Sequence, residues 1–187
     1  MPTHLAEALA PDPAEPGAQA GGEPSLLAEL ALLALKIAFV AGFAAMVLVF
    51  MFGLTIVPDE SMSPMVREGD LIVYYRLQKQ YSAGDLIIVN DGERKEVRRV
   101  IAVAGDEVDF SESGLMVNGY PQSEERIYVE TLPFSEGITY PVKLGEGKVF
   151  VLGDNRPQSR DSRLYGLVDV ESGTEGEVMT MIRRRNF

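Results

Sequence analysis

The apolar residues of this chain are concentrated in one stretch near its N-terminus. From Ile37 to Val57 the sequence contains no charged residue, and the apolar character begins at Leu26. About 20 consecutive apolar residues are enough to cross a bilayer as an α-helix. The pattern therefore predicts a transmembrane helix over 25–57. A buried core helix fits less well, because the remaining chain is too small to enclose it. A cleavable signal peptide fits less well because the preceding residues are acidic.

The remainder of the chain, 58–187, has the pattern of a β domain. Its runs rich in Val, Ile, Tyr and Phe are LIVYYRL, DLIIV, VRRVIAVAG, DEVDF, GLMVNGY, KVFVLG and GEVMTMI. Asn118-Gly119 is a hairpin signal, and turns are expected at the Gly-Asp pairs, which are Gly69-Asp70, Gly84-Asp85, Gly105-Asp106 and Gly153-Asp154. The spacing of these runs predicts a compact antiparallel β domain, coiled or closed to protect its edges.

The first residues, 1–24, are rich in proline and contain no Lys or Arg. Such a stretch cannot bury enough apolar surface to fold alone, so we expect a disordered tail. The chain as a whole has a net charge of −11, which excludes a general electrostatic nucleic-acid binder.

The residue inventory also limits the chemistry. The chain has no Cys, and its single His, His4, lies in the polar N-terminal stretch, so neither a Ser-His-Asp triad nor a thiolate or multi-His metal site is expected. Acid–base chemistry is left to Lys, Asp, Glu, Tyr or hydroxyl groups. No cofactor and no metal are expected.

One hydroxyl lies close to the predicted membrane helix. Ser61 follows Val57 by four residues, and an extended chain of that length reaches roughly 14 Å. A nucleophile there would act near the bilayer surface, on a segment that emerges from the same bilayer.

Three sequence blocks lie behind the predicted helix. They are Ser61-Met62-Ser63-Pro64 followed by Gly69-Asp70, then Arg99 to Asp106, then Gly153-Asp154-Asn155-Arg156 with Ser159, Asp161-Ser162-Arg163 and Gly166. The three blocks resemble those of the type I signal peptidases, which are membrane-anchored serine proteases. Each block alone is a weak signal. Their order behind one anchor makes the resemblance strong.

The resemblance implies a Ser-Lys dyad in which a buried lysine of lowered pKa takes the proton of the serine. The serine position is Ser61. The lysine position, seven residues before Gly105, is occupied by Arg98. A guanidinium is not deprotonated in proteins, so Arg98 cannot act as a general base. The nearest amine, Lys95, lies an odd number of residues away on a strand and is expected on the opposite face unless a bulge intervenes.

A second departure lies two residues before Ser61. Many family members carry there a serine that helps to bind the oxyanion, whereas this chain has Asp59. An ionised carboxylate would repel the developing negative charge. Asp59 and Arg98 are also candidates for one compensating ion pair.

By resemblance, the third block supports the dyad. Ser159 occupies the position that orients the lysine, and Asp154 and Arg163 are expected to brace their loop. The implied substrates are preproteins whose signal peptides bind as an added β-strand. The bilayer and the secretion translocon are the further partners. The resemblance places the protein in the plasma or inner membrane with a single span and the β domain outside the cytoplasm, an orientation on which the flanking charges are nearly silent.

The function that the resemblance implies is that of a membrane-anchored, signal peptidase I-like serine endopeptidase, which removes signal peptides from exported preproteins at the membrane surface. Three alternatives stay open. A catalytically impaired pseudoprotease of the same fold would bind signal-peptide or pilin-like segments without cleaving them, and Arg98 and Asp59 favour it. A self-cleaving Ser-Lys protease of the SOS-repressor type is disfavoured by the apolar stretch. A generic membrane-tethered β-barrel adaptor leaves the spacing of the three blocks unexplained.

Overall fold

The computed structural model describes residues 25–90, 92–112, 114–122, 127 and 130–184. The predicted disorder of 1–24 lies outside these residues. The chain divides into two units, Met1–Gly42 and Phe43–Phe187, which are described separately.

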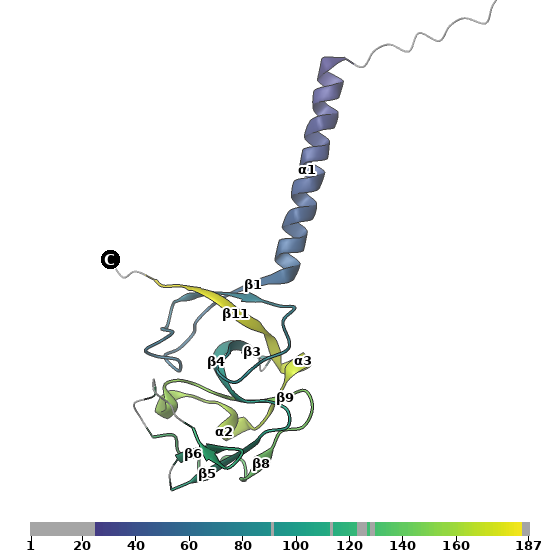
Figure 1. Ribbon diagram of the computed structural model, residues 1–187. Helices are drawn as coiled ribbons and strands as arrows, with labels where there is room; N and C mark the ends of the chain where they lie inside the picture. The colour runs from purple at the N-terminus through teal and green to yellow at the C-terminus, as the bar shows by residue number, and fades with distance from the viewer. Residues whose placement is uncertain (1–24, 91, 113, 123–126, 128–129, 185–187) are drawn as a thin grey trace, which may run out of the picture. The chain divides into compact units, whose positions relative to one another are not determined.

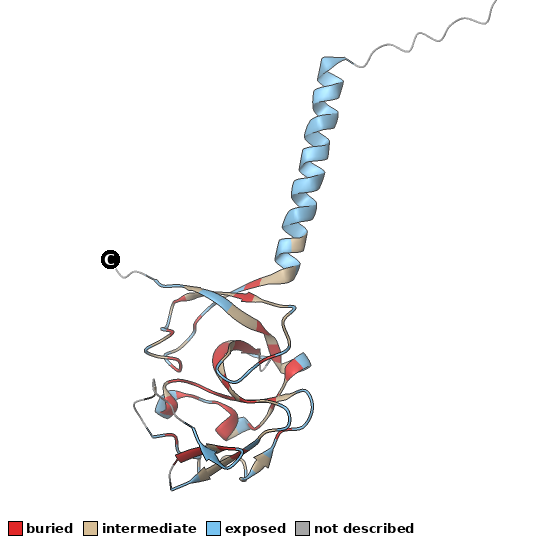
Figure 2. Cartoon of the chain, in the orientation of Figure 1, coloured by how far each residue is buried: buried red, intermediate tan, exposed pale blue. Residues whose placement is uncertain are grey.

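Helix α1 (Leu26–Met51) has no buried residue (Figure 2) and is long and apolar enough to cross a membrane. It ends earlier than the sequence predicts, because Phe52–Ile56 forms strand β1 and pairs with β2 (Leu71–Tyr75). Gly53 fits this pairing, since a Cβ there would lie 2.1 Å from Cζ of the Tyr74 ring. Ladder hydrogen bonds of the sheet therefore end the helix within the apolar stretch.

The larger sheet has seven strands in the order β1-β2-β11-β3-β4-β9-β10, and all neighbours are antiparallel. Its remaining strands are β3 (Leu86–Asn90), β4 (Lys95–Ala102), β9 (Lys148–Leu152), β10 (Val168–Asp169) and β11 (Thr174–Ile182). Strand β11, drawn in yellow in Figure 1, lies between β2 and β3. The C-terminal strand thus joins the segment that follows α1 to the strands of the middle of the chain.

The smaller sheet has four strands in the order β7-β6-β5-β8. They are β5 (Glu107–Ser111), β6 (Gly114–Val117), β7 (Tyr120–Pro121) and β8 (Val142–Lys143). The predicted hairpin at Asn118-Gly119 joins β6 to β7, with φ of 53° and 78° at its two central residues. Positive φ at both central positions is what a tight type I′ hairpin requires.

The described helical segments of the β domain are short. They are η1 (Arg156–Gln158), α2 (Ser162–Tyr165) and α3 (Val170–Gly173). Apolar side chains of both sheets form the core, which is visible as the red interior in Figure 2. The predicted antiparallel β domain is confirmed. Each predicted β run overlaps a strand, and the run 114–120 spans β6 and the start of β7.

Candidate active site

Ser61 lies in a loop whose two ends are tied together. The backbone N–H of Val57 donates to the Asp70 carbonyl at 3.0 Å, and the N–H of Gly69 donates to the Val57 carbonyl at 2.9 Å. The next residue, Met62, is fully buried in the core. Ser61 is therefore held at a fixed place in the domain, and its side chain is 3% exposed.

Arg98 reaches Ser61 from strand β4. Its Nη1 donates to Ser61 Oγ at 2.8 Å and to the Val97 carbonyl at 2.7 Å. Its Nη2 donates to Glu96 Oε2 at 2.7 Å, and Nη2 and Nε donate to the Arg160 carbonyl at 2.9 and 3.2 Å. A guanidinium has five N–H donors, and these contacts use all of them. Arg98 is thus a fully satisfied, buried cation on the serine hydroxyl.

The anion that accompanies Arg98 is Glu96, which the sequence reasoning missed. Residues two apart on a strand point to the same face, so the spacing within Lys95–Ala102 would have been the signal. The side chains of Glu96 and Arg98 are 9% and 1% exposed. The ion pair that we considered between Asp59 and Arg98 is replaced by this one.

Asp59 instead contacts the backbone of the serine. Its Oδ1 accepts a hydrogen bond from the Ser61 N–H at 2.9 Å, two residues along the chain. Asp side chains commonly bond the backbone in this local way. The amide nearest to the hydroxyl, which would be available to an oxyanion, is therefore occupied by a carboxylate.

The loop 153–163 packs against the Ser61 loop and carries the expected bracing residues. The Asn155 N–H donates to the Ser61 carbonyl at 2.9 Å. Arg163 pairs with both carboxylate oxygens of Asp161 at 2.9 Å, and Arg99 pairs with both oxygens of Asp154 at 2.8 and 2.6 Å. The sequence predicted Asp154 and Arg163 as bracing residues, and these contacts suit that role.

Gly153 is the one glycine of the four Gly-Asp pairs without a positive φ. A Cβ there would lie 2.2 Å from Ser159 Oγ and 2.6 Å from the Ser61 carbonyl oxygen. The glycine is needed for this close approach rather than for a turn. In the described part of the chain the buried Ser159 hydroxyl has no hydrogen-bond partner.

Lys95 does not reach Ser61. Its amine contacts Tyr74 Oη at 3.2 Å and Glu175 Oε2 at 3.1 Å. The register between β3 and β4 is continuous from Asn90↔Lys95 to Leu86↔Arg99, so no bulge turns Lys95 to the other face. Burial alone lowers the pKa of Lys95, but hydrogen bonds with Tyr74 and Glu175 outweigh burial, and the pKa is raised above 10.5. This environment is the opposite of the one that a general-base lysine needs.

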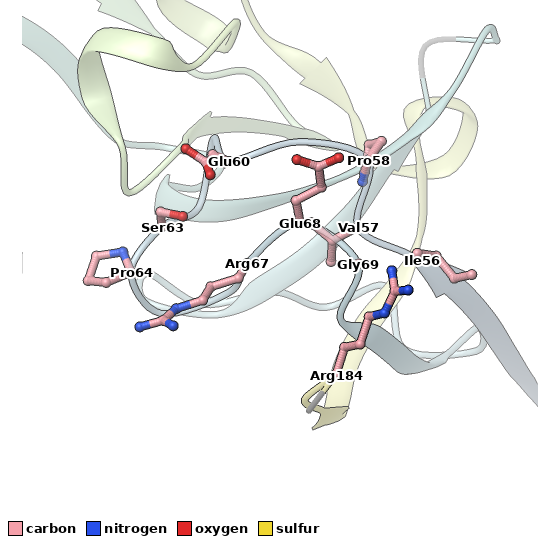
Figure 3. A pocket seen from close by; sticks show the side chains of 10 residues that line it. All are labelled: Ile56, Val57, Pro58, Glu60, Ser63, Pro64, Arg67, Glu68, Gly69 and Arg184. Carbon is pink, nitrogen blue, oxygen red and sulfur yellow. The ribbon is translucent and has the colours of Figure 1, made fainter. Parts of the chain in front are cut away.

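A hollow borders the Ser61 loop without including the serine (Figure 3). Its lining residues are Ile56, Val57, Pro58, Glu60, Ser63, Pro64, Arg67, Glu68, Gly69 and Arg184. The charged side chains that line it are two glutamates and two arginines. We therefore place the candidate site at the buried contact between Ser61 and Arg98. Among the described residues, no group of three or more His, Cys, Asp or Glu could hold a metal ion.

A buried serine that follows an apolar helix, lies on an antiparallel β domain and contacts a side chain of strand β4 is the arrangement that the resemblance to signal peptidases predicts. The family model of signal peptidase, peptidase S26, matches residues 30–182. The chain therefore belongs to the signal peptidase family.

Two curated relatives agree with this assignment. The chain is 34% identical over 140 residues to signal peptidase I of Bacillus licheniformis, covering 67% of this chain and 74% of that protein. It is 33% identical over 153 residues to signal peptidase IB of Staphylococcus aureus (strain COL), covering 67% and 78%. A crystal structure of a signal peptidase I from Enterococcus faecalis matches with 27% identity and a TM-score of 0.42, over 54% of this chain and 97% of that one.

Proposed function

We propose that this protein recognises the signal peptides of exported preproteins at the membrane surface and hydrolyses them very slowly or not at all. The observation that carries the proposal is the contact of Arg98 Nη1 with Ser61 Oγ at 2.8 Å. A serine nucleophile needs a neutral base within hydrogen-bond reach, and a guanidinium supplies only donors.

Neither the nearest lysine nor the nearby phenol of Tyr165 is suited to replace the missing base. Lys95 is bound to Tyr74 and Glu175. The phenol of Tyr165 is protonated at physiological pH, as that of any tyrosine with a pKa of 10.0 or above, and is therefore a poor proton acceptor. General-base catalysis typically contributes ~10²–10⁴ in rate, and we expect a loss of at least this size.

Strand β4 offers a place for a peptide to bind as an added strand. Its partner β9 pairs with it only from Arg99 to Ala102. Hydrogen-bonded pairs alternate along an antiparallel ladder, and the N–H of Val100 donates to Asp85 beside β3. Val97 lies an odd number of residues from Val100, so its peptide groups point away from β3, towards the side on which β9 pairs only from Arg99 onwards. Its carbonyl already accepts a hydrogen bond from Arg98 Nη1 at 2.7 Å, so a bound peptide would compete with Arg98 for this group. This geometry supports recognition by β-augmentation next to Ser61.

Family membership favours a second candidate, an active endopeptidase that removes signal peptides. The retained Ser61 position and the names of the relatives support it. This candidate requires a base other than Arg98.

The test uses the full chain in detergent with a preprotein substrate. We expect binding of the preprotein by the native chain, with little or no cleavage. Ser61→Ala is the matched variant for catalysis, and Ser63→Ala, a neighbouring hydroxyl that lines the hollow, is its control. Ordinary turnover that Ser61→Ala removes would establish the endopeptidase. Absence of preprotein binding would refute recognition.

We further propose that α1 is a single span in the plasma or inner membrane and that the β domain lies outside the cytoplasm, where it meets preproteins leaving the translocon. Protease added to intact spheroplasts should digest the β domain. Its protection until the cells are lysed would place it on the other side.

A further inference from the structure

Glu96 and Ser61 are held by the same guanidinium. Arg98 Nη2 donates to Glu96 Oε2 at 2.7 Å while Nη1 donates to Ser61 Oγ at 2.8 Å. Both side chains of the ion pair are nearly inaccessible to solvent. The other carboxylate oxygen of Glu96 pairs with Arg94 Nε at 2.9 Å, which holds the glutamate in this position.

We propose that Glu96 is a positioning residue of this site: its carboxylate fixes the cation of residue 98 on Ser61 and would keep any amine introduced there in its charged form. The proposal rests on the proposed function, in which the native site lacks a base. It also implies that restoring a base requires changes at two positions, 96 and 98, because a lysine at position 98 alone would stay charged.

The other carboxylates around the site contact groups other than Arg98 and are the same in every variant compared below, Asp59 on the Ser61 N–H included. Asp161 is paired through both oxygens with Arg163, and Asp154 with Arg99. Asp59 accepts from the Ser61 N–H through Oδ1. Tyr165, which also interacts with Arg98, is neutral at physiological pH, because its pKa is not below the 10.0 of an ordinary tyrosine. Among the described residues, Glu96 is thus the carboxylate in direct contact with the side chain at position 98.

An ammonium that reaches Ser61 Oγ would lie within the roughly 4–6 Å over which a carboxylate strongly favours the charged form. Such a neighbour typically moves a pKa by about 1–3, and each step of one is a tenfold change in the fraction of neutral amine. Arg98→Lys alone should therefore gain little activity at neutral pH. Arg98→Lys combined with Glu96→Gln should gain at least tenfold more.

The experiment measures the introduced amine directly. Full chains carrying Arg98→Lys, with and without Glu96→Gln, are labelled in their lysine side chains and titrated by NMR in detergent micelles. The matched control adds Glu175→Gln to Arg98→Lys, which removes the carboxylate on Lys95 instead. In parallel, preprotein cleavage is measured against pH, with Ser61→Ala in each background.

We expect the amine from Arg98→Lys to titrate at or above the ordinary value for lysine, and at least one pH unit lower once Glu96→Gln is added. Glu175→Gln should change the titration of Lys95 and leave the introduced amine unchanged. The pH profile of cleavage should move with the amine and disappear with Ser61→Ala.

If the amine introduced by Arg98→Lys titrated at the same pH with and without Glu96→Gln, the proposal would be overturned. Glu96→Ala supplies the same comparison if the glutamine variant does not fold. An amine that titrates near neutral pH in Arg98→Lys alone would overturn the proposal without any double variant. Failure of the native chain to bind preproteins would refute the proposed function only, since the titration does not depend on substrate.

Discussion

The loop 153–163 and the centre at Ser61 and Arg98 form one site, but their charges are arranged differently. In the loop, Asp161 and Arg163 pair with each other and so hold the backbone that contacts Ser61. At the centre, a cation lies on the hydroxyl and a carboxylate lies on the amide of the same serine. The loop contacts fit the bracing role that the family resemblance implies, and the centre departs from it.

The difference shows that bracing and catalysis make separate demands on a site. Bracing needs only paired charges and satisfied hydrogen bonds. Groups that stay charged at neutral pH, such as the carboxylate and guanidinium of a salt bridge, meet this need. Catalysis needs one group that is neutral at the working pH and accepts a proton. A scaffold can therefore hold a serine in place while the proton acceptor is absent.

The largest effect is expected in the bracing loop. Asp161→Ala leaves the buried guanidinium of Arg163 without its carboxylate and the Gly153 N–H without its acceptor. Breaking a buried ion pair on one side typically costs about 3–5 kcal/mol, and we expect a loss of this size in the free energy of unfolding. Thermal and urea unfolding of the full chain measure it.

The control for this prediction is Lys148→Ala, which breaks a pair with Asp169 in which both side chains are about 40% exposed. Surface pairs contribute little, so its melting temperature should stay close to that of the native chain. If Asp161→Ala were as mild as Lys148→Ala, the paired charges would not be what holds the loop.

At the centre, removal of Asp59 should raise the rate once a base is present. Asp59→Ser in the Glu96→Gln/Arg98→Lys background frees the Ser61 N–H for an oxyanion and supplies a hydroxyl beside it. One oxyanion donor is typically worth ~10²–10³ in kcat, which sets the upper limit of the gain. Single-turnover cleavage of a preprotein measures it, with Glu60→Ser as the neighbouring control. An unchanged rate would mean that the amide is not used by the oxyanion.

The strands of this domain were predictable because their apolar residues alternate and their turns carry Gly, Asp and Asn. The end of α1 was not, because pairing of Phe52–Ile56 with β2 depends on residues that follow later in the chain. Ser61 and the position of Arg98 followed from the motif blocks. The role of Glu96 did not, because the need for a counterion becomes visible only when Arg98 is seen to be buried.

A smaller effect is expected on the opposite side of β4, where Glu175 lies beside Lys95. Burial alone raises the pKa of Glu175, but hydrogen bonds from Asn90 and Lys95 and the charge of Arg76 hold it below 4.5. A carboxyl whose pKa is lower in the folded than in the unfolded chain stabilises the fold above its unfolded pKa. This contribution is lost as the pH falls through the folded pKa.

Glu175→Gln should therefore flatten the dependence of the melting temperature on pH below about 4.5, the ordinary value for this group. The variant and the native chain should approach each other as the pH decreases. Glu112→Gln, at an exposed glutamate, is the control and should follow the native profile. If the melting temperatures of Glu175→Gln and of the native chain changed with pH in parallel, the lowered pKa of Glu175 would be contradicted.

The smallest effect is expected for Lys95→Met, which tests whether the two sides of β4 are chemically separate. The amine of Lys95 is held by Tyr74 and Glu175, its pKa is raised, and an unbroken β3–β4 register separates it from Ser61. Methionine keeps much of the apolar stem, so packing on the Tyr74 ring is largely retained. Preprotein binding should be unchanged in the native chain, as should any cleavage after Arg98→Lys. Loss of cleavage in both backgrounds would mean that β4 adopts another register during turnover and that Lys95 is the missing base.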